Sequence, residues 1–276
     1  MNFAGYDIKA LALDLDGTLT NEKKEITART KQAVSRAIDS GIAIILASGR
    51  PVLGIRAVAE ALDLYSKGGY ILAYNGGEII DCKRNSVIFS QTLPIELYSD
   101  IVRVGREFGV HALTYDKKGV IAESADAPYV IKEAFNNGIE ITTVEDLSLV
   151  LSDPVVKFMI VGDPIKISNA LDYLKRKFSG KANVFLSEPY FMEITAIGIE
   201  KAKALTRMIE HLKIDQTQLA ACGDGLNDLS MLEYAGLSVA MANAYEQVKL
   251  AADYITLSNK DDGVADFIEK LLTERK

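Results

Sequence analysis

The sequence predicts an α/β protein with a doubly wound parallel-sheet core and an inserted α+β domain. Two observations predict the parallel sheet. Near-continuous aliphatic runs recur at both ends of the chain, and stretches with helical periodicity separate them. Such runs are typical of strands buried on both faces, as in parallel sheets. A third observation predicts the insertion, because the strands between these ends are shorter and several are joined by turn-like connections.

The parallel pattern begins with the aliphatic run at residues 8–15, IKALALDL. A helix is predicted over residues 27–41, with Thr27 as its N-cap. Residues 42–48 (IAIILAS) predict the next strand, and residues 70–77 (YILAYNGG) predict a third strand followed by a turn. A strand–helix–strand order of this kind predicts a right-handed crossover in a doubly wound sheet.

The middle of the chain is expected to form an antiparallel sheet with helices on one face. Its strand-like segments lie at residues 86–93, 110–124, 155–163 and 182–195. Residues 115–119 (YDKKG) predict a hairpin turn in which the glycine supplies the permissive backbone angle. Helices are expected to begin at prolines, which suit the first helical turn. These prolines are Pro94, Pro128 and Pro164.

The parallel pattern returns after about residue 193. A helix is predicted over residues 200–212, and apolar strands are predicted at residues 218–225, 237–243 and 254–258. We therefore expect one core made from both ends of the chain, with a second domain inserted into it, which a surface loop tolerates. The expected boundaries are residues 1–82 and 193–276 for the core and residues 83–192 for the inserted domain.

The composition is that of a soluble globular protein. Hydrophobic residues make up 49% of the 276 residues and charged residues 25%, so a sizeable core can form. No apolar run approaches the ~18 residues of a membrane span, and the first ten residues lack the pattern of a secretion signal. With only two cysteines we expect a reducing, cytoplasmic location. The net charge of −7 argues against nucleic-acid binding and still permits a locally positive phosphate site.

Polar and charged residues follow several of the predicted parallel strands. In open parallel sheets, ligands bind beyond the carboxyl ends of the strands, so these residues are expected to converge at one edge. The first strand ends at Asp14 and Asp16, and Lys201 stands near the start of a helix. The other residues expected at this edge are Ser48, Gly49 and Arg50 after the second strand, and Asp224, Asn227 and Asp228 after the strand at residues 218–222.

This concentration of carboxylates predicts a bound cation. Carboxylates that lie a few ångström apart repel one another, and at least one would take up a proton unless a cation is present. Oxygen ligands without a nearby histidine or cysteine suit Mg²⁺, which also accepts a phosphate oxygen from a substrate. His111 and His211 lie outside these strand ends, which argues against zinc.

The motifs together resemble those of the haloacid dehalogenase superfamily of phosphohydrolases. Four motifs stand in order along the chain, namely DLDGT (14–18), LASGR (46–50), GIEKAKAL (198–205) and GDGLND (223–228). The long insert between the second and third motifs, together with YNGG and AGLSVAMANA, resembles the Cof-like (IIB) phosphatase branch with the second cap type. The resemblance implies a Rossmann-like core with a cap domain, and a phosphoric monoester hydrolase that uses Mg²⁺ and acts on a small phosphorylated metabolite.

The resemblance also implies a role for each motif residue. Asp14 would be the nucleophile, which forms an aspartyl-phosphate, and Asp16 would be the general acid and base. The metal would be held by Asp14, the backbone carbonyl of Asp16 and Asp224. The phosphate would be held by Lys201 and Ser48 with Gly49, Arg50 and Asn227 nearby, and Thr18 and Asp228 would support these groups from behind.

Several alternatives remain open at this point. Ala196 and Ala202 stand where the branch often has proline and glycine, so Lys203 is a neighbouring alternative to Lys201. Arg50 could contact the substrate or pair with an acidic neighbour. A phosphomutase of the mannose-phosphate mutase type, and a non-catalytic phosphate-ligand sensor, are the alternative functions. A dehalogenase is disfavoured because its reaction needs neither Asp16 nor a metal ligand such as Asp224.

Overall fold

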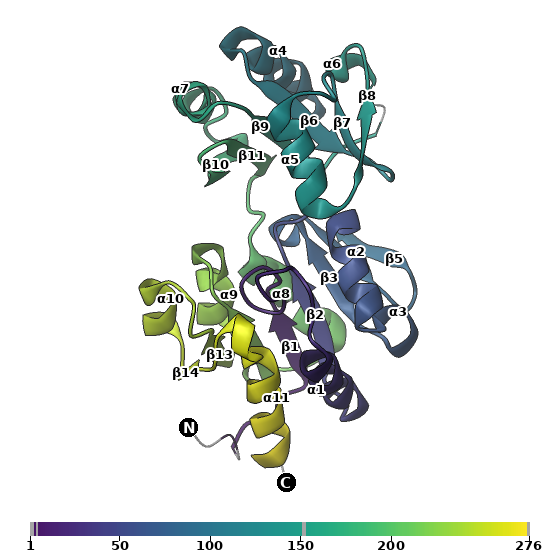
Figure 1. Ribbon diagram of the computed structural model, residues 1–276, viewed down its shortest axis with the longest axis vertical. Coiled ribbons are helices and arrows are strands. Elements are labelled where there is room, and N and C mark those ends of the chain that lie inside the picture. The colour runs from purple at the N-terminus through teal and green to yellow at the C-terminus, as the bar shows by residue number, and fades with distance from the viewer. Residues whose placement is uncertain (1–2, 4, 151–152, 275–276) are drawn as a thin grey trace. The chain divides into compact units, whose positions relative to one another are not determined.

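The computed structural model describes residues 3, 5–150 and 153–274, and the chain divides into two compact units (Figure 1). The first unit combines both ends of the chain, and the second is formed mainly by the middle of it. The first comprises Met1–Gly49, Ile55–Phe89 and Glu200–Lys276, and the second comprises Arg50–Gly54 and Ser90–Ile199.

The first unit is built on an eight-stranded sheet with the strand order β14-β13-β12-β1-β2-β3-β4-β5. All neighbours from β14 to β3 pair in parallel, and β4 joins β3 in the antiparallel direction. The strands are β1 (Ala10–Leu13), β2 (Ala43–Ala47), β3 (Tyr70–Ala73), β4 (Glu78–Asp81), β5 (Ser86–Ser90), β12 (Leu219–Gly223), β13 (Leu237–Ala240) and β14 (Tyr254–Ile255). The predicted α/β class with a parallel-sheet core is therefore confirmed.

Helices connect these strands, and both faces of the central strands are covered. All residues of β1 and of β12 are buried, which is the burial pattern of strands packed on both sides. The predicted cap at Thr27 is confirmed, because its side chain accepts a hydrogen bond from the backbone N–H of Thr30. The helices are α1 (Ala28–Asp39), α2 (Val52–Ala61), α3 (Leu64–Lys67), α8 (Lys201–Leu212), α9 (Leu229–Tyr234), α10 (Glu246–Ala251) and α11 (Gly263–Glu274).

The second unit contains a six-stranded sheet with the order β10-β11-β9-β6-β7-β8. Helices α4 and α7 pack against one shared hydrophobic cluster with this sheet. The strands are β6 (His111–Tyr115), β7 (Gly119–Ala122), β8 (Glu140–Thr143), β9 (Lys157–Val161), β10 (Ala182–Glu188) and β11 (Phe191–Ala196). The helices are α4 (Tyr98–Phe108), α5 (Pro128–Asn137), α6 (Leu147–Val150) and α7 (Pro164–Lys177), preceded by the 3-10 helix η2 (Ile95–Leu97).

The expected antiparallel sheet is present with one exception. Strands β6 and β7 form the predicted hairpin, in which the backbone N–H of Asp116 donates to the carbonyl of Gly119 at 3.0 Å. Strands β7 and β8 instead pair in parallel. The reason is α5, which lies between them in the chain and returns it to the same end of the sheet, as a parallel crossover requires.

The unit boundaries differ from the expected residues 83–192. The second unit begins at Ser90 because β5 adds to the edge of the first unit's sheet, next to β4. It ends at Ile199 because β11 is a central strand of the second sheet, paired with both β10 and β9. Short apolar strands look alike in sequence, and only their hydrogen-bonded partners assign β5 and β11 to different sheets.

Both cysteines, Cys82 and Cys222, are free and buried. Burial raises the pKa of the Cys82 thiol to about 12, so it stays protonated at neutral pH. None of the helices in the described ranges has both the length and the apolar character that a membrane span requires.

A buried ion pair joins two neighbouring strands of the second unit's sheet. Lys157 on β9 is 3% exposed and Glu193 on β11 is 6% exposed, and Nζ of the lysine lies 3.4 Å from the glutamate Oε2. A third buried charge, Glu133 of α5, accepts a hydrogen bond from Tyr115 and has a raised pKa, first because of burial and less because of Glu193. Lys157 is thus flanked by two buried carboxylates.

Replacing Lys157 with methionine is expected to destabilise the protein by about 3–5 kcal/mol at about pH 8, because Glu133 and Glu193 lose the cation that compensates them. The loss should shrink near about pH 5, because Glu133, whose pKa is raised in the folded state, then takes up a proton. Urea unfolding at both pH values measures this. Arg103→Met removes exposed ion pairs with Asp100 and Glu107 and should leave stability almost unchanged. Equal, small losses for both variants would contradict the expectation.

Candidate active site

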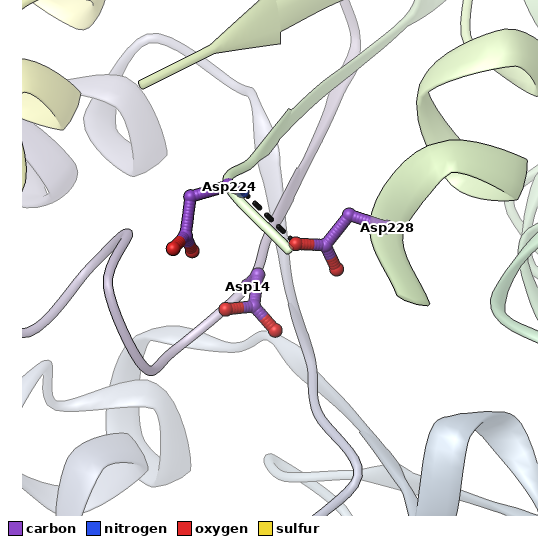
Figure 2. A group of neighbouring side chains, drawn as sticks. All are labelled: Asp14, Asp224 and Asp228. Carbon is purple, nitrogen blue, oxygen red and sulfur yellow. Dashed lines mark hydrogen bonds between the residues drawn. The ribbon is translucent and has the colours of Figure 1, made fainter. Parts of the chain in front are cut away.

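Three strand ends of the first unit's sheet bring charged residues together. Strands β12, β1 and β2 are neighbours, and Asp224, Asp14 and Ser48 each follow the last residue of one of them. Figure 2 shows Asp14, Asp224 and Asp228 with their carboxylates gathered at this edge. One oxygen from each of these carboxylates lies within 4.8 Å of the others. The convergence expected from parallel-strand topology is present for these residues.

Lys201 is the cation at the centre of this group. It is the first residue of α8 and is 1% exposed. Its Nζ donates to Oδ1 of Asp14 at 2.6 Å and to Oδ1 of Asp228 at 2.6 Å. The neighbouring Lys203, by contrast, is exposed. The geometry therefore favours Lys201 over Lys203 as the lysine of the site.

The Asp228 side chain is hydrogen-bonded to the backbone of the turn that follows β12. Its Oδ2 accepts the N–H of Asp224 at 3.0 Å, drawn as the dashed line in Figure 2, and the N–H of Gly225 at 2.9 Å. Its Oδ1 accepts from Lys201, so both oxygens of this fully buried side chain are engaged. Asp228 thus fixes the turn after β12 and the position of the lysine together.

The turn after β1 fits closely against Asp224. The N–H of Thr20 donates to the carbonyl of Leu15 at 2.9 Å and closes the turn. Gly17 has a φ of +80°, and a Cβ atom there would lie 2.2 Å from Oδ2 of Asp224, so only glycine fits. Thr18 donates its hydroxyl to Oδ1 of Asp224 at 2.8 Å. This contact joins residues 206 positions apart in the sequence and places Thr18 directly behind Asp224.

Asp16 occupies a different environment from Asp14. Asp14 is buried, whereas the Asp16 side chain is exposed, and an isolated β-bridge pairs the Asp16 backbone with Thr20. The Asp16 carboxylate does not belong to the close group of three, although its charge contributes to the raised pKa of Asp224. Accessibility of this kind is what a group that exchanges protons with substrate and water requires.

The remaining predicted residues differ in how closely they approach the cluster. Ser48 is 3% exposed at the end of β2, and Gly49 follows it. Asn227 is exposed in the turn that also contains Asp228. Arg50 donates to the backbone carbonyl of Gly54 at 3.3 Å and belongs with the second unit. The roles of these residues stay predictions.

The pKa values of the clustered residues indicate that the carboxylates carry more negative charge than Lys201 alone compensates. Burial raises the pKa of Asp14 well above its usual value; the charge of Asp228 adds to the rise, and Lys201 opposes it. Burial also raises the pKa of Asp224 to about 6. Burial alone would lower the pKa of Lys201, but the two carboxylates that it contacts raise it, so it stays charged. The positive charge of one lysine therefore faces the negative charges of three neighbouring carboxylates.

This donor set fits a hard divalent cation. All of its ligand atoms are oxygens, which suits Mg²⁺ and disfavours softer metals. Asp228 has both oxygens engaged by Lys201 and the backbone, so it is the least available ligand. The contacts described above use Oδ1 of Asp14 and Oδ1 of Asp224. Asp14 and Asp224 are therefore the members of the group that could hold such an ion.

Mg²⁺ is expected to raise the unfolding temperature more at about pH 7.5 than at about pH 5. The folded-state pKa of Asp224, about 6, lies above the usual value, so the ion-free protein loses stability as pH rises from about 4 to about 6. Below this range protons compete with the ion, and above it the ion restores the lost stability. Thermal unfolding with Mg²⁺ and with chelator measures the shift. Asp224→Asn should remove most of it at both pH values, and a wild-type shift independent of pH would contradict the argument.

Two features of this edge were not predicted from the sequence. Asn243, after β13, donates from Nδ2 to the carbonyl of Gly17 at 2.8 Å and so supports the turn after β1. The AGLSVAMANA segment was the only signal for it. A turn with positive φ at Tyr74 and Asn75, in the YNGG segment, lies next to Ser48. This segment was expected to form a turn, but its backbone conformation was not predicted.

Comparison with known proteins relates this geometry to a family. The sequence matches the haloacid dehalogenase-like hydrolases over residues 11–268. It is 33% identical to the 5-amino-6-(5-phospho-D-ribitylamino)uracil phosphatase YcsE of Bacillus subtilis, over 95% of each chain.

Two solved structures resemble the fold closely. A haloacid dehalogenase-like hydrolase from Bacteroides thetaiotaomicron aligns with a TM-score of 0.94 and 44% identity, covering 96% of this chain and 99% of that one. The subclass IIB sugar phosphatase BT4131 aligns with a TM-score of 0.77 and 26% identity, covering 95% and 98%. The resemblance inferred from the motifs is confirmed, and the chain belongs to the family of haloacid dehalogenase-like hydrolases, in its Cof-like IIB branch.

Proposed function

We propose that this protein hydrolyses a small phosphorylated metabolite with Mg²⁺ as its ion and Asp14 as its nucleophile. Its class as a phosphoric monoester hydrolase follows from the family match and from relatives named phosphatases. The substrate, the ion and the role of each residue are the proposed part. The observation that carries the proposal is the buried group in which Lys201 bridges Asp14 and Asp228 beside Asp224.

In the first step an oxygen of Asp14 forms a bond to phosphorus, and the bond between phosphorus and the ester oxygen breaks. Asp16 donates its proton to the departing oxygen, which leaves as an alcohol. In the second step Asp16 removes a proton from a water molecule, whose oxygen bonds to phosphorus. The bond to Asp14 then breaks and inorganic phosphate leaves. The balance requires Asp16 to be protonated first, and its exposed position gives it access to both partners.

The other residues of the site supply charge and position. Lys201 is held by two carboxylates, so its ammonium group is fixed where phosphoryl oxygens would bind beside Asp14. Ser48 and the backbone around Gly49 would hold a further oxygen. The ion, when bound by Asp14, Asp224 and the Asp16 carbonyl, would supply positive charge to the phosphoryl oxygens. A phosphoryl transfer needs this positioning and charge compensation more than it needs a strong base.

Sugar phosphates and phosphorylated cofactor precursors are the proposed substrates. YcsE is named for a substrate with a phosphorylated ribityl chain, and BT4131 is named a sugar phosphatase. We propose that the second unit serves as the cap domain of this branch and selects among such substrates. The chain's net charge of −7 is consistent with small phosphorylated partners rather than nucleic acid.

A phosphate-release screen tests the proposal. Purified protein is incubated with a panel of sugar phosphates, polyol phosphates and phosphorylated cofactors, with Mg²⁺ and separately with chelator. We expect free phosphate from a subset of the panel, and only with Mg²⁺. Formation of an isomeric phosphate ester that depends on a bisphosphorylated activator would indicate a phosphomutase instead. Phosphate binding without release of phosphate from any ester would indicate a sensor.

A further inference from the structure

The turn that follows β3 has an unusual backbone. Tyr74 and Asn75, in the 3-10 helix η1 (Tyr74–Gly76), have φ values of +54° and +57°. Asparagine tolerates this left-handed region, but tyrosine rarely adopts it. The turn joins β3 to the antiparallel strand β4, and consecutive residues with positive φ are the geometry of tight hairpin turns, so the backbone alone does not explain which side chain stands here.

On one side the turn is bound to the end of β2. The backbone N–H of Asn75 donates to the carbonyl of Ser48 at 2.8 Å. The Asn75 side chain also lies directly against Gly49, where an added Cβ would be 3.2 Å from Nδ2 and 3.3 Å from Oδ1. The amide group is thus packed on the residue whose backbone is proposed to hold phosphate.

On the other side the turn packs closely against the start of α8. Gly76 has a φ of +93°, and a Cβ atom there would lie 2.3 Å from Cβ of Ala204 and 3.3 Å from the carbonyl of Glu200. These two residues lie on either side of Lys201 in the chain. The turn therefore touches both elements that carry the proposed phosphate-binding groups.

The Asn75 side chain does not serve as an ordinary turn former. In such turns the side-chain oxygen accepts backbone N–H bonds, as Oδ1 of Asn21 does from Lys23 and Glu25. Oδ1 of Asn75 is buried and accepts no hydrogen bond from any residue in the described ranges. A buried acceptor without a partner is unfavourable, so stabilisation of its own turn does not account for this amide.

We propose that Asn75 is a positioning residue for the bound phosphoryl group: its amide packs on Gly49 and holds that residue in place, and this neutral group lies beside the phosphate. The inference rests on the proposed function, because it takes Ser48, Gly49 and Lys201 as the phosphate-binding groups. A neutral side chain is required at this place because a carboxylate there would repel the phosphate dianion. An asparagine combines this neutrality with tolerance of the left-handed backbone.

Two substitutions separate this role from a structural one. Asn75→Asp keeps the shape and the tolerance of positive φ but adds negative charge, and Asn75→Gly keeps the backbone freedom and removes the amide. Asn85 offers a matched control, since it has a φ of +48° in an exposed turn of the same unit. The corresponding controls are Asn85→Asp and Asn85→Gly.

The measurements are the affinity for inorganic phosphate in the presence of Mg²⁺, by calorimetry, and KM and kcat for p-nitrophenyl phosphate. Both Asn75 variants should bind phosphate at least about 10-fold more weakly, with Asn75→Asp the weaker binder, and should raise KM more than they lower kcat. Unfolding temperatures should stay near that of the wild type for Asn75→Asp. The Asn85 variants should remain within about twofold of the wild type in phosphate affinity.

A phosphate affinity of Asn75→Asp within twofold of the wild type would overturn the inference, because a purely structural role predicts that result. Equal losses in the Asn85 variants would overturn it as well. Wild-type protein that binds phosphate but releases none from any ester would overturn the proposed function alone, and the phosphate affinities would still decide the role of Asn75. Wild-type protein that binds no phosphate would overturn the inference.

Discussion

Replacing Asp14 with asparagine is expected to lower kcat for phosphate release by about 10⁴-fold or more, because the amide cannot form the bond to phosphorus. The substitution keeps the size of the side chain but removes one of the three carboxylates grouped around Lys201. Burial already raises the pKa of Asp14, so its charge is unfavourable to the folded state in the absence of the ion. We therefore expect the unfolding temperature of the ion-free variant to be equal to or higher than that of the wild type.

This combination separates a chemical role from a structural one. A variant that is inactive but at least as stable as the wild type has lost a reacting group rather than its fold. Steady-state phosphate release and thermal unfolding in chelator, on the same preparations, give the two quantities. Full turnover by Asp14→Asn would show that another residue attacks phosphorus. Inactivity accompanied by a large loss of stability would contradict the electrostatic argument.

Lys201→Met is expected to have the second-largest effect, on both stability and activity. Lys201 is fully buried with two carboxylates at 2.6 Å, and its removal leaves Asp14 and Asp228 without their cation. Breaking a buried pair in this way destabilises a protein by about 3–5 kcal/mol. Phosphate release should fall together with stability, because the fixed positive charge beside the nucleophile is lost.

The pH dependence of this variant identifies the cause. Without the lysine, the charge that opposes the rise in the pKa of Asp14 is gone, so this folded-state pKa rises further above its unfolded value. The folded variant then binds more protons than the unfolded chain, so its stability should recover as pH falls through the folded-state pKa of Asp14. Urea unfolding at about pH 8 and about pH 5 measures the recovery.

Lys203→Met is the matched control, because Lys203 is exposed on the same helix. It should change stability by no more than about 0.5 kcal/mol and leave turnover near the wild-type rate. If Lys203→Met lost activity while Lys201→Met kept it, the assignment of the phosphate-binding lysine would be reversed.

Much of this site was predictable because topology alone places it. Asp14, Ser48 and Asp224 end three parallel strands, and such strand ends share one edge of a sheet whichever residues lie between them. The oxygen-only character of these residues predicted a hard cation in the same way. Lys201 depended on the family resemblance, since no periodicity distinguishes it from Lys203 two residues later.

The rest depended on contacts between distant parts of the chain. Gly17 is required by the approach of Asp224, and Thr18 is bonded to the same side chain, yet each reads locally as an ordinary turn residue. The turn at residues 74–76 contacts the end of β2 and the start of α8, which lie far from it in the sequence. The edge position of β5 is likewise fixed only by its pairing with β4. Non-local pairing of this kind leaves no signal in a single sequence.

The central claim is that phosphate passes through a covalent intermediate on Asp14, and trapping that intermediate tests it most directly. In Asp16→Asn the second step should be slow, because no carboxylate activates the water molecule. Mixing this variant with Mg²⁺ and p-nitrophenyl phosphate, whose leaving group needs no proton from Asp16, quenching with acid and analysing its peptides by mass spectrometry should reveal a phosphoryl group on Asp14. The double variant with Asp14→Asn should carry none. Phosphate release by Asp16→Asn without any labelled Asp14 peptide, or a phosphoryl group found on a different residue, would contradict the account.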